Sequence, residues 1–367
     1  MPDTISRMPK SHFQQIEAKS ANARSGILNT RRGPVSTPFF MPVATRAEVK
    51  GVDPFSVKAT GAEVLLSNTY HLHLQPGEKI IKALGGLHKF NLWDGPILTD
   101  SGGFQIFSLS KIRKITEEGV EFVDPKTGDK IFISPEISMQ IQVDLGSDII
   151  MAFDDLTGLG LSDRKRTAEA VARTHRWLER SIKEYKKLTK NLAETKRPLL
   201  FGISQGGLDK KLRQESLEFV QSQEVDGVAI GGLSVGESRE EMHAMLRFLT
   251  TLYDPKFIRY LMGVGDPIDL RYAIENGIDM LDCVLPTRNA RHGSVWISDH
   301  KRLNLKNAAF TNDAQPIDKN CDCQTCQAGY SRALLRHLYK SGNTLAGSLA
   351  SIHNLRYLQR ICESYKK

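Results

Sequence analysis

Short apolar runs alternate with longer runs of helical periodicity through most of the chain, and this alternation restricts the fold more than any other feature. Within each short run the apolar residues are continuous, which is typical of parallel strands buried on both faces. The predicted strands are Thr37–Val43, Glu63–Ser67, Pro96–Asp100, Asp148–Asp154, Leu199–Ser204, Gly227–Gly231, Ile258–Val264 and Met280–Leu285. Eight strands over roughly 250 residues favour a closed (β/α)8 TIM barrel, with a doubly wound open sheet as the alternative.

Helix starts can be recognised between these strands. Ser134, Pro135 and Glu136 supply an N-cap, a first-turn proline and an acidic residue in that order. Ser162 and Asp163 are expected to open a long helix, and further helices are expected over residues 237–253 and 267–276. Strands that alternate with helices in this way support the barrel.

The net charge indicates which kind of partner the protein could bind, and the lack of long apolar segments indicates where in the cell we expect it. Lys and Arg outnumber Asp and Glu by 50 to 42, which gives a net charge of +8 and is compatible with an anionic partner. Residues 1–20 lack the apolar segment of a secretory signal, and no apolar run is long enough to span a bilayer. We therefore expect a cytoplasmic protein without a membrane segment.

Three cysteines lie within six residues near the C-terminal end. The spacing Cys321-x-Cys323-x2-Cys326 places three thiols in one tight loop, which suits a zinc ion better than a disulfide in a reducing compartment. Zinc needs a fourth ligand to complete a tetrahedron, and His337 and His353 both follow at suitable positions. Four protein ligands leave no open position, so the predicted metal has a structural role.

Two segments depart from the strand–helix alternation. Residues 107–134 are too many for a plain loop, and the sequence VDPKTGDK within them indicates a turn between two β-like runs, so we expect an inserted hairpin. From about residue 299 the alternation stops. We therefore expect two units: residues 1–298 as a catalytic barrel with an N-terminal β cap, and residues 299–367 as a zinc-binding subdomain with C-terminal helices packed on the barrel.

Polar residues and glycines gather where the predicted strands end. In a TIM barrel the carboxyl ends of all strands meet at one rim, where active sites lie. The strand ends read Asp100–Gln105, Phe153–Asp155, Gln205–Gly207, Gly231–Ser234, Gly263–Asp266 and Asp282. A single aspartate at a strand end usually only caps a turn, but several acids on one rim indicate a site. Asp282 lies inside an apolar run, where capping does not explain it and burial is costly.

The residue types at these strand ends narrow the chemistry. No strand end carries a lysine placed for a Schiff base, and none shows a histidine pattern for a catalytic metal. A carboxylate nucleophile with a carboxylate acid or base remains, a combination that suits substitution at the anomeric carbon of a sugar. At this point an O-glycoside hydrolase and an N-glycosyl transferase are both open. The segment DMLDCVLPTRNARHG ends in a basic loop with Arg288 and Arg291, which suits a phosphate-bearing substrate.

The motifs resemble those of bacterial-type tRNA-guanine transglycosylases. The matching segments run in the family's order over nearly the whole chain: LTDSGGFQ, MAFDD, GISQGG, VAIGGLSVGE, YLMGVGDP, DMLDCVLPTRNARHG and CDCQTCQ…IHNLRYLQR. The resemblance implies a (β/α)8 barrel with a zinc subdomain, commonly assembled as a homodimer. It also implies an enzyme that exchanges guanine 34 of tRNAs with GUN anticodons (Asp, Asn, His and Tyr) for preQ1, 7-aminomethyl-7-deazaguanine, in queuosine biosynthesis.

The resemblance also implies a role for each residue of the site. Asp282 would be the nucleophile that attacks ribose C1′, and Asp100 would accept a proton from the incoming base. Asp154 would accept hydrogen bonds from the base, Gln205 and the Gly232 N–H would bind its O6 side, and Phe104 would stack on its ring. Other residues of the base pocket would be Ser101, Gly102, Gly103, Leu233 and Met262. The RNA would contact Gly263, Val264, Gly265, Asp266, Pro267, Ile268, Asp269, Thr287, Arg288, Asn289, Ala290 and Arg291. The zinc ligands would be Cys321, Cys323, Cys326 and His353.

The chain departs from the family pattern beside the base pocket. Many bacterial members have Asp-Glu-Cys where this chain has Asp154-Asp155-Leu156, whereas Val235 in SVGE matches the bacterial pattern. Because the leucine would lie near the 7-substituent of the base, queuine is an alternative to preQ1 as the incoming base. A non-catalytic tRNA-binding subunit is a second alternative, although Asp100 and Asp282 are both present.

Overall fold

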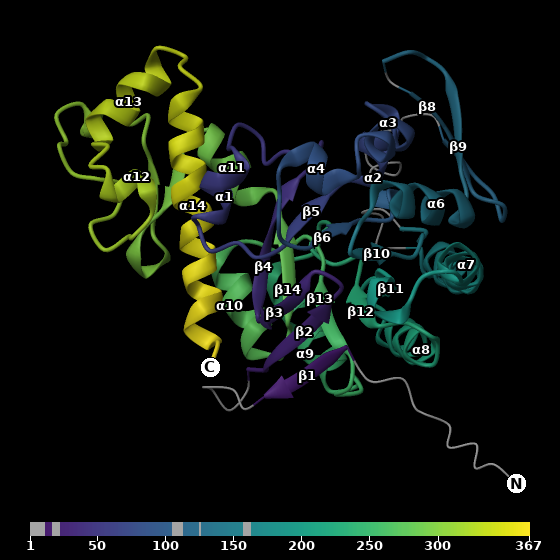
Figure 1. Ribbon diagram of the computed structural model, residues 1–367. Helices are drawn as coiled ribbons and strands as arrows, with labels where there is room; N and C mark the ends of the chain where they lie inside the picture. The colour runs from purple at the N-terminus through teal and green to yellow at the C-terminus, as the bar shows by residue number, and fades with distance from the viewer. Residues whose placement is uncertain (1–11, 17–22, 105–112, 125, 157–162) are drawn as a thin grey trace, which may run out of the picture.

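Eight parallel strands form a closed barrel, as predicted (Figure 1). The structure, a computed structural model, describes residues 12–16, 23–104, 113–124, 126–156 and 163–367. The barrel strands are β4 (Phe39–Ala44), β5 (Leu65–Ser67), β6 (Ile97–Thr99), β10 (Ile149–Met151), β11 (Leu199–Ser204), β12 (Gly227–Ile230), β13 (Ile258–Leu261) and β14 (Met280–Cys283). The ring closes because β14 pairs with β4 in parallel, with Met280 opposite Phe39.

Each predicted strand overlaps an observed one, but several predicted strands run past the observed ends. Asp100, Asp154 and Val264 were placed inside strands, and all three lie just beyond β6, β10 and β13. The prediction of a loop around Arg288 was wrong, because α11 (Leu285–Arg291) begins directly after β14 with Pro286 in its first turn. Proline fixes a helical φ and needs no hydrogen-bond acceptor there, so it favours a helix start.

Helices surround the barrel, and α6 and α7 begin at predicted caps. The Ser134 side chain accepts a hydrogen bond from the backbone N–H of Ile137 at the start of α6, and Asp163 caps α7; Ser162, also expected at this start, lies outside the described residues. Ser238 and Glu241 form a reciprocal capping box at α9. The helices of this layer are α1 (Pro54–Lys58), α2 (Thr69–Leu74), α3 (Glu78–Ala83), α4 (Leu87–Asn91), α6 (Pro135–Leu145), α7 (Arg164–Thr189), α8 (Lys210–Gln221), α9 (Arg239–Thr250) and α10 (Pro267–Glu275). No helix among the described residues is both long and apolar enough to cross a membrane.

An antiparallel sheet of three strands covers the amino-terminal end of the barrel (Figure 1). Its strands are β1 (Phe13–Ile16), β2 (Ser25–Thr30) and β3 (Gly33–Thr37). Phe13, Leu28 and Val35 join the apolar cluster that fills the barrel interior, which includes Phe201 and Met280. The sheet therefore closes the end of the barrel that is opposite the carboxyl rim.

Three aspartates connect this sheet to the barrel, of which Asp148 and Asp279 are buried and Asp226 is half-buried. Asp148, Asp226 and Asp279 directly precede the alternate strands β10, β12 and β14. Each carboxylate accepts a backbone N–H from the neighbouring strand region, from Ile97, Leu200 and Arg259 respectively, at 2.8–2.9 Å. Each also faces a basic side chain of the N-terminal segment: Arg31 at 2.8 Å, His12 at 3.6 Å and Arg24 at 3.6 Å.

The segment predicted as a hairpin is a three-stranded antiparallel sheet. The predicted hairpin is present as β8 (Val120–Val123) and β9 (Lys130–Ile133), and β7 (Arg113–Ile115) adds a third strand; residues 107–112 lie outside the described residues. The Trp177 indole of α7 donates to the Glu117 carbonyl at 2.8 Å, and the Arg176 guanidinium binds the Glu117 carboxylate through two nitrogens. These contacts attach the sheet to the barrel.

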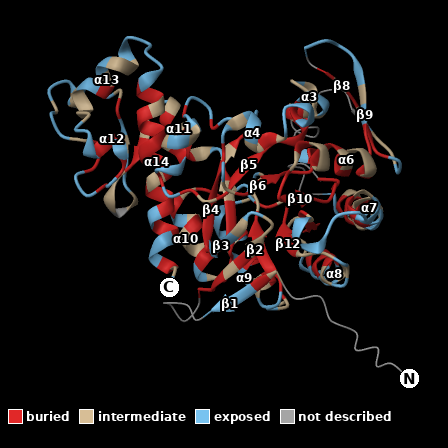
Figure 2. Cartoon of the chain, in the orientation of Figure 1, coloured by how far each residue is buried: buried red, intermediate tan, exposed pale blue. Residues whose placement is uncertain are grey.

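The C-terminal region leaves the barrel and returns to it. It contains β15 (Ser294–Trp296), β16 (Arg302–Asn304), α12 (Gln324–Gln327), α13 (Arg332–Lys340) and α14 (Leu345–Tyr365), with the 3-10 turns η2 (Ser298–His300) and η3 (Ala308–Phe310). A further 3-10 turn, η1 (Glu194–Lys196), precedes β11 in the barrel. Helix α14 is mostly buried and packs against α11, β4 and α10 (Figure 2). Its Gln359 amide donates to the Phe40 carbonyl of β4 at 2.9 Å. A division of the chain at residues 298 and 299 stays a prediction.

Candidate active site and metal centre

Asp282 occupies β14 at the carboxyl rim and is partly exposed, unlike its neighbours in the strand. Its Oδ1 atom accepts hydrogen bonds from the Tyr260 hydroxyl at 2.6 Å and from the Gly263 backbone N–H at 2.9 Å. Burial raises the pKa of Asp282, and these two donors oppose the rise. Burial also keeps the pKa of Tyr260 well above its usual range, so the phenol remains a donor. The carboxylate is held by one oxygen.

Asp100 lies just beyond β6 and is nearly fully buried. Its carboxylate accepts hydrogen bonds from the Asn68 side-chain amide and from the backbone N–H groups of Thr69 at 3.0 Å and Gly102 at 3.2 Å. Burial raises the pKa of Asp100 to about 7, and the nearby charge of Asp282 adds to the rise. A carboxyl group with such a pKa can exchange a proton near neutral pH.

Asp154 and Gln205 meet across the rim from β10 and β11. Asp154 accepts hydrogen bonds from the Ser101 hydroxyl at 2.8 Å and from the Gln205 amide at 2.7 Å. Burial raises the pKa of Asp154 to about 6. Together these residues form a buried polar surface with acceptors and a donor, which suits the Watson–Crick edge of a base.

Glycines give this surface its shape. A Cβ atom at Gly103 would lie 2.9 Å from Asp154 Oδ1, and one at Gly232 would lie 2.4 Å from Gln205 Oε1. Gly232 also has φ of +64°, which disfavours other residues. Leu156 lies on the same side, with its Cδ1 atom 3.5 Å from that Gly232 position. Side chains at either glycine would therefore displace the polar groups.

The remaining predicted pocket residues differ in exposure. Leu233 is buried, Met262 is half-buried, and Phe104 is 51% exposed. Gln105, the last residue of that predicted motif, lies outside the described residues. Asp155, which neighbours Asp154, is engaged by two arginines of α7, Arg166 and Arg173. It is therefore unsuited to bind a base.

The sequence reasoning missed Arg213, a fully buried residue of α8. Its guanidinium donates to the carbonyl groups of Ser204, Gly207, Gly231 and Gly232, at 2.7–3.2 Å. Burial lowers the pKa of Arg213 to about 10, which still leaves it charged at neutral pH. The residue thus joins the two loops that carry Gln205 and Gly232, and only a structure could reveal it because these loops are distant in sequence.

The stretch Gly263–Asp269 is clamped from α9, a contact that was also missed. Arg239 pairs with Asp269 at 2.7 Å and with Asp266 at 3.1 Å, and His243 contacts Asp269 at 2.8 Å. Asp266 also caps α10, and Gly263 at the other end of the loop donates to Asp282. Val264 and Pro267 are buried, whereas Gly263 and Ile268 are exposed. Gly265 is confined, because a Cβ there would lie 2.4 Å from Cys283 Cβ.

Helix α11 carries the second predicted RNA-contacting stretch. Arg288 is exposed, Asn289 and Arg291 are half-buried, and Thr287 and Ala290 are buried. Burial and the neighbouring Arg288 lower the pKa of Arg291. The Ala290 carbonyl accepts a hydrogen bond from the Tyr339 hydroxyl of α13, which connects this helix to the C-terminal region.

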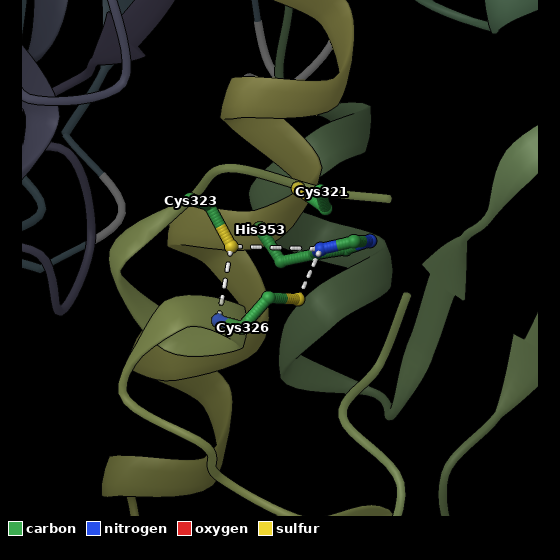
Figure 3. A group of neighbouring side chains, drawn as sticks. All are labelled: Cys321, Cys323, Cys326 and His353. Carbon is green, nitrogen blue, oxygen red and sulfur yellow. Dashed lines mark hydrogen bonds between the residues drawn. The ribbon is translucent and has the colours of Figure 1, made fainter. Parts of the chain in front are cut away.

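Three thiols and one imidazole converge at the predicted metal site (Figure 3). The ligand atoms of Cys321, Cys323, Cys326 and His353 all lie within 4.8 Å of one another, and all four residues are buried. His353 Nδ1 lies 3.7 Å from Cys323 Sγ and 3.4 Å from Cys326 Sγ. The other candidate, His337, is exposed on α13 and is not part of the cluster.

This cluster could bind a metal ion, and its geometry is consistent with zinc. Ligands bound to zinc at about 2.0–2.3 Å in a tetrahedron are separated by roughly 3.3–3.8 Å, a range that includes the two distances from His353 Nδ1 to the sulfur atoms. His353 Nε2 lies 2.6 Å from the Trp296 carbonyl, so it can donate its proton there and leave Nδ1 to face the thiols.

Comparisons with known proteins show which family the chain belongs to. The family model described as queuine tRNA-ribosyltransferase matches residues 19–367. The chain is similar to two proteins named queuine tRNA-ribosyltransferase. The one from Prochlorococcus marinus strain AS9601 is 47% identical over 92% of this chain and 88% of the relative. The one from Haemophilus ducreyi is 49% identical over 95% of this chain and 90% of the relative. With its closed barrel, its acidic rim and its Cys3His cluster, the chain belongs to the queuine tRNA-ribosyltransferase family of pentosyltransferases.

Proposed function

We propose that the protein exchanges guanine 34 in tRNAs with GUN anticodons (Asp, Asn, His and Tyr) for preQ1, through a covalent intermediate on Asp282. The family membership supports a tRNA and a guanine-type base as substrates. The observation that carries the proposal is the setting of Asp282: a partly exposed carboxylate at the barrel rim, held through Oδ1 by Tyr260 and Gly263.

In the first step an oxygen of Asp282 attacks C1′ of the ribose of nucleotide 34. The C1′–N9 bond breaks, its electron pair goes to guanine N9, and an ester joins Asp282 to the RNA. The Tyr260 and Gly263 donors keep the carboxylate oriented and ionised before the attack. Cys283 does not compete as a nucleophile, because burial raises the pKa of its thiol to about 12.

In the second step the incoming base attacks C1′ and displaces the Asp282 carboxylate. The N9–H proton of the base passes to Asp100, whose pKa of about 7 suits a proton acceptor near neutral pH. Two displacements at C1′ restore the original configuration. The ester conserves the glycosyl bond energy, so no nucleoside triphosphate is required.

Asp154, Gln205 and the Gly232 N–H would recognise the base. Gln205 donates to Asp154 in the structure, so a bound base would replace this contact with its own N–H groups and O6. Phe104 would stack on the ring, and Ser101, Gly102, Gly103, Leu233 and Met262 would complete the pocket. Extracting base 34 from the anticodon stack costs a few kcal/mol, which these contacts would offset.

The Asp282 ester can be tested directly by trapping. Wild-type protein incubated with tRNA and then denatured is expected to yield a protein–RNA adduct at Asp282 by gel and mass spectrometry, and to incorporate labelled guanine. Asp282→Ala should do neither, whereas Glu240→Ala, an exposed acidic residue on α9, should do both. Exchange by Asp282→Ala would refute the mechanism. Tight tRNA binding by wild-type protein without any exchange would favour a non-catalytic tRNA-binding subunit.

Leu156 is expected to influence which base enters. It is buried beside Gly232, so its branched side chain reduces the space for a 7-substituent. In a competition among guanine, preQ1 and queuine, we expect preQ1 to be preferred over queuine. Leu156→Cys should raise incorporation of substituted bases several-fold relative to guanine. Equal incorporation ratios in both proteins would show that Leu156 does not select the base.

The RNA would lie along Gly263–Asp269 and Thr287–Arg291, with Arg288 and Arg291 placed for phosphates. If these arginines bind phosphates, tRNA affinity should fall steeply with ionic strength. The four-ligand cluster would hold one structural zinc per subunit, which metal analysis can count. We also propose a cytoplasmic homodimer, to be checked by sedimentation analysis.

A further inference from the structure

A polar cleft of about 660 Å³ opens at the amino-terminal end of the barrel, away from the rim that carries Asp282. It lies where β1, the end of α9 and the start of β13 meet, near the lower edge of the molecule in Figure 1. Its lining includes Gln15, Arg24, Thr251, Arg259 and Asn276. The proposed exchange reaction does not use this cleft.

Arg24 and Arg259 are both more than nine-tenths buried, with 6% and 8% exposure. Arg24 Nη2 donates to the carbonyls of Pro255 and Phe257 at 3.1 and 3.3 Å, its Nε faces the unpaired Oδ1 of Asp279 at 3.6 Å, and its Nη1 has no hydrogen-bond acceptor. Arg259 Nη1 has one long contact of 3.5 Å to the Gly277 carbonyl, and its Nε has none. Buried guanidinium donors without acceptors are costly, so an acceptor is expected there.

The buried charges beside the cleft do not balance among the described residues. Two guanidinium groups face one buried carboxylate, Asp279, whose Oδ1 is 3.6 Å from Arg24 Nε and whose Oδ2 is occupied by the backbone N–H of Arg259. Burial and the neighbouring Arg24 lower the pKa of Arg259 to about 10. Glu275 also lines the cleft, but it is exposed and accepts a hydrogen bond from the Tyr365 hydroxyl. Asp254 is half-buried and accepts one from the backbone N–H of Lys256. One positive charge therefore remains in the buried part.

The backbone and the aromatic rings hold the two guanidinium groups in place. Gly277 has φ of +82°, and a Cβ there would lie 2.9 Å from Arg259 Nη1 and 3.4 Å from the Arg24 Cδ atom. Arg24 packs over the Phe13 ring at 4.9 Å, and Arg259 packs over the Tyr253 ring at 5.0 Å. Both groups are held by their flat faces, and their unpaired N–H donors lie in the plane of each guanidinium group.

We propose that this cleft binds a phosphate group, either as the free ion or as a phosphate monoester. Guanidinium groups prefer oxyanions that accept several hydrogen bonds, and a phosphate would supply both the acceptors and the charge that the buried groups lack. The neutral side chains of Gln15, Thr251 and Asn276 at the cleft can add hydrogen bonds to the remaining oxygens.

The test compares phosphate binding by matched variants at constant ionic strength set with chloride. Inorganic phosphate and a nucleoside 5′-monophosphate are titrated in parallel by calorimetry and thermal unfolding. Wild-type protein should show a saturable heat and a Tm that rises with ligand concentration, because a ligand that binds only the folded state stabilises it. Tighter binding of the monophosphate would identify a monoester as the ligand, whereas equal binding would identify the free ion.

Thr251→Glu puts a carboxylate at the exposed edge of the cleft and should weaken phosphate binding at least tenfold. Thr195→Glu adds the same charge at an exposed position outside the cleft and should bind phosphate like wild type. Both variants should retain base exchange, which shows that they are folded. No saturable response in wild type, or an equal response in Thr251→Glu, would overturn the proposal. Arg259→Gln is a further check if it folds, and it should also lose phosphate binding.

Discussion

Asp282 receives both of its hydrogen bonds on Oδ1, from Tyr260 and Gly263. The other oxygen has no protein donor among the described residues, so it is free to approach a ribose carbon. The same two donors also set the orientation of the carboxylate. The proposed chemistry depends on this difference: Oδ1 is held by two donors, and the other carboxylate oxygen is left to react.

Tyr260→Phe removes one donor from Asp282 without changing the shape of the buried ring. A hydrogen bond to a charged group is worth about 1.5–3 kcal/mol, so kcat for base exchange should fall roughly 10- to 100-fold. Because this bond lowers the pKa of Asp282, its loss should also move the acid limb of the pH–rate profile to higher pH.

The control for this prediction is Tyr272→Phe, since that hydroxyl binds the His243 carbonyl rather than a rim carboxylate. It should leave the pH–rate profile unchanged. An unchanged profile in Tyr260→Phe, with kcat near wild type, would mean that the Gly263 N–H alone suffices to hold Asp282.

Single residues could be predicted where their type conflicts with their surroundings. Asp282 was conspicuous because an acid interrupts an apolar run, and Asp100 because it ends a predicted strand at the rim where other acids gather. Tyr260 and Arg213 gave no such signal, since a tyrosine in a strand and an arginine in a helix are ordinary. Their roles come from contacts with residues that are distant in the chain or on another element.

At the scale of elements, α9 and α10 are joined by the clamp of Arg239 and His243 on Asp266 and Asp269. The loop that begins at Gly263 ends at the clamped Asp266. We therefore expect Arg239 to be a positioning residue that acts through this loop on Asp282. It also pairs with carboxylates that would repel the phosphates of the proposed RNA substrate.

Arg239→Gln should lower kcat about 3- to 10-fold and raise KM for tRNA, because the loop loses its support and two carboxylates lose their partner. Arg239→Lys should restore part of the loss. Steady-state kinetics with tRNA and labelled guanine measure both effects. Arg247→Gln, an exposed change on the same helix, is the control. Equal kinetics in both glutamine variants would mean that the clamp is not needed.

The elements were predictable where one sequence signal dominates. The eight barrel strands were found because each is a continuous apolar run, and α6 and α7 because their caps are standard. The short strand β7 was missed, since Arg-Lys-Ile carries no apolar pattern and depends on pairing with β8. Helix α11 was mistaken for a loop because its basic residues resemble a solvated turn and its apolar positions are few.

At the scale of the whole molecule, Asp148 joins three parts of the chain: Arg31 of the N-terminal segment, His88 at α4 and the Ile97 backbone. These partners lower the pKa of Asp148 despite its burial. A lowered folded-state pKa contributes stability above the unfolded-state pKa of about 3.9, and this contribution is lost as the pH falls through the folded-state value. For Asp279, whose pKa is raised to about 6, the sign is opposite, so its contribution is lost as the pH rises through that value.

Arg31→Gln should therefore reduce the free energy of unfolding by about 1–3 kcal/mol at pH 7, since it removes one partner of a buried carboxylate. The difference from wild type should shrink as the pH falls below the lowered pKa of Asp148. Chemical denaturation at several pH values measures this. Lys130→Gln removes an exposed ion pair with Glu121 and should change little. A deficit for Arg31→Gln that stays constant with pH would contradict the assigned linkage.

The order of the elements in the chain has a consequence for biosynthesis. Helix α14 covers β4 and α11, yet it follows every barrel strand and the metal-binding loop in the sequence. A ribosome therefore releases the first barrel strand long before the helix that shields it. We expect nascent chains halted before Leu345 to remain sensitive to protease and to need a chaperone, and those extended past Tyr365 to become resistant.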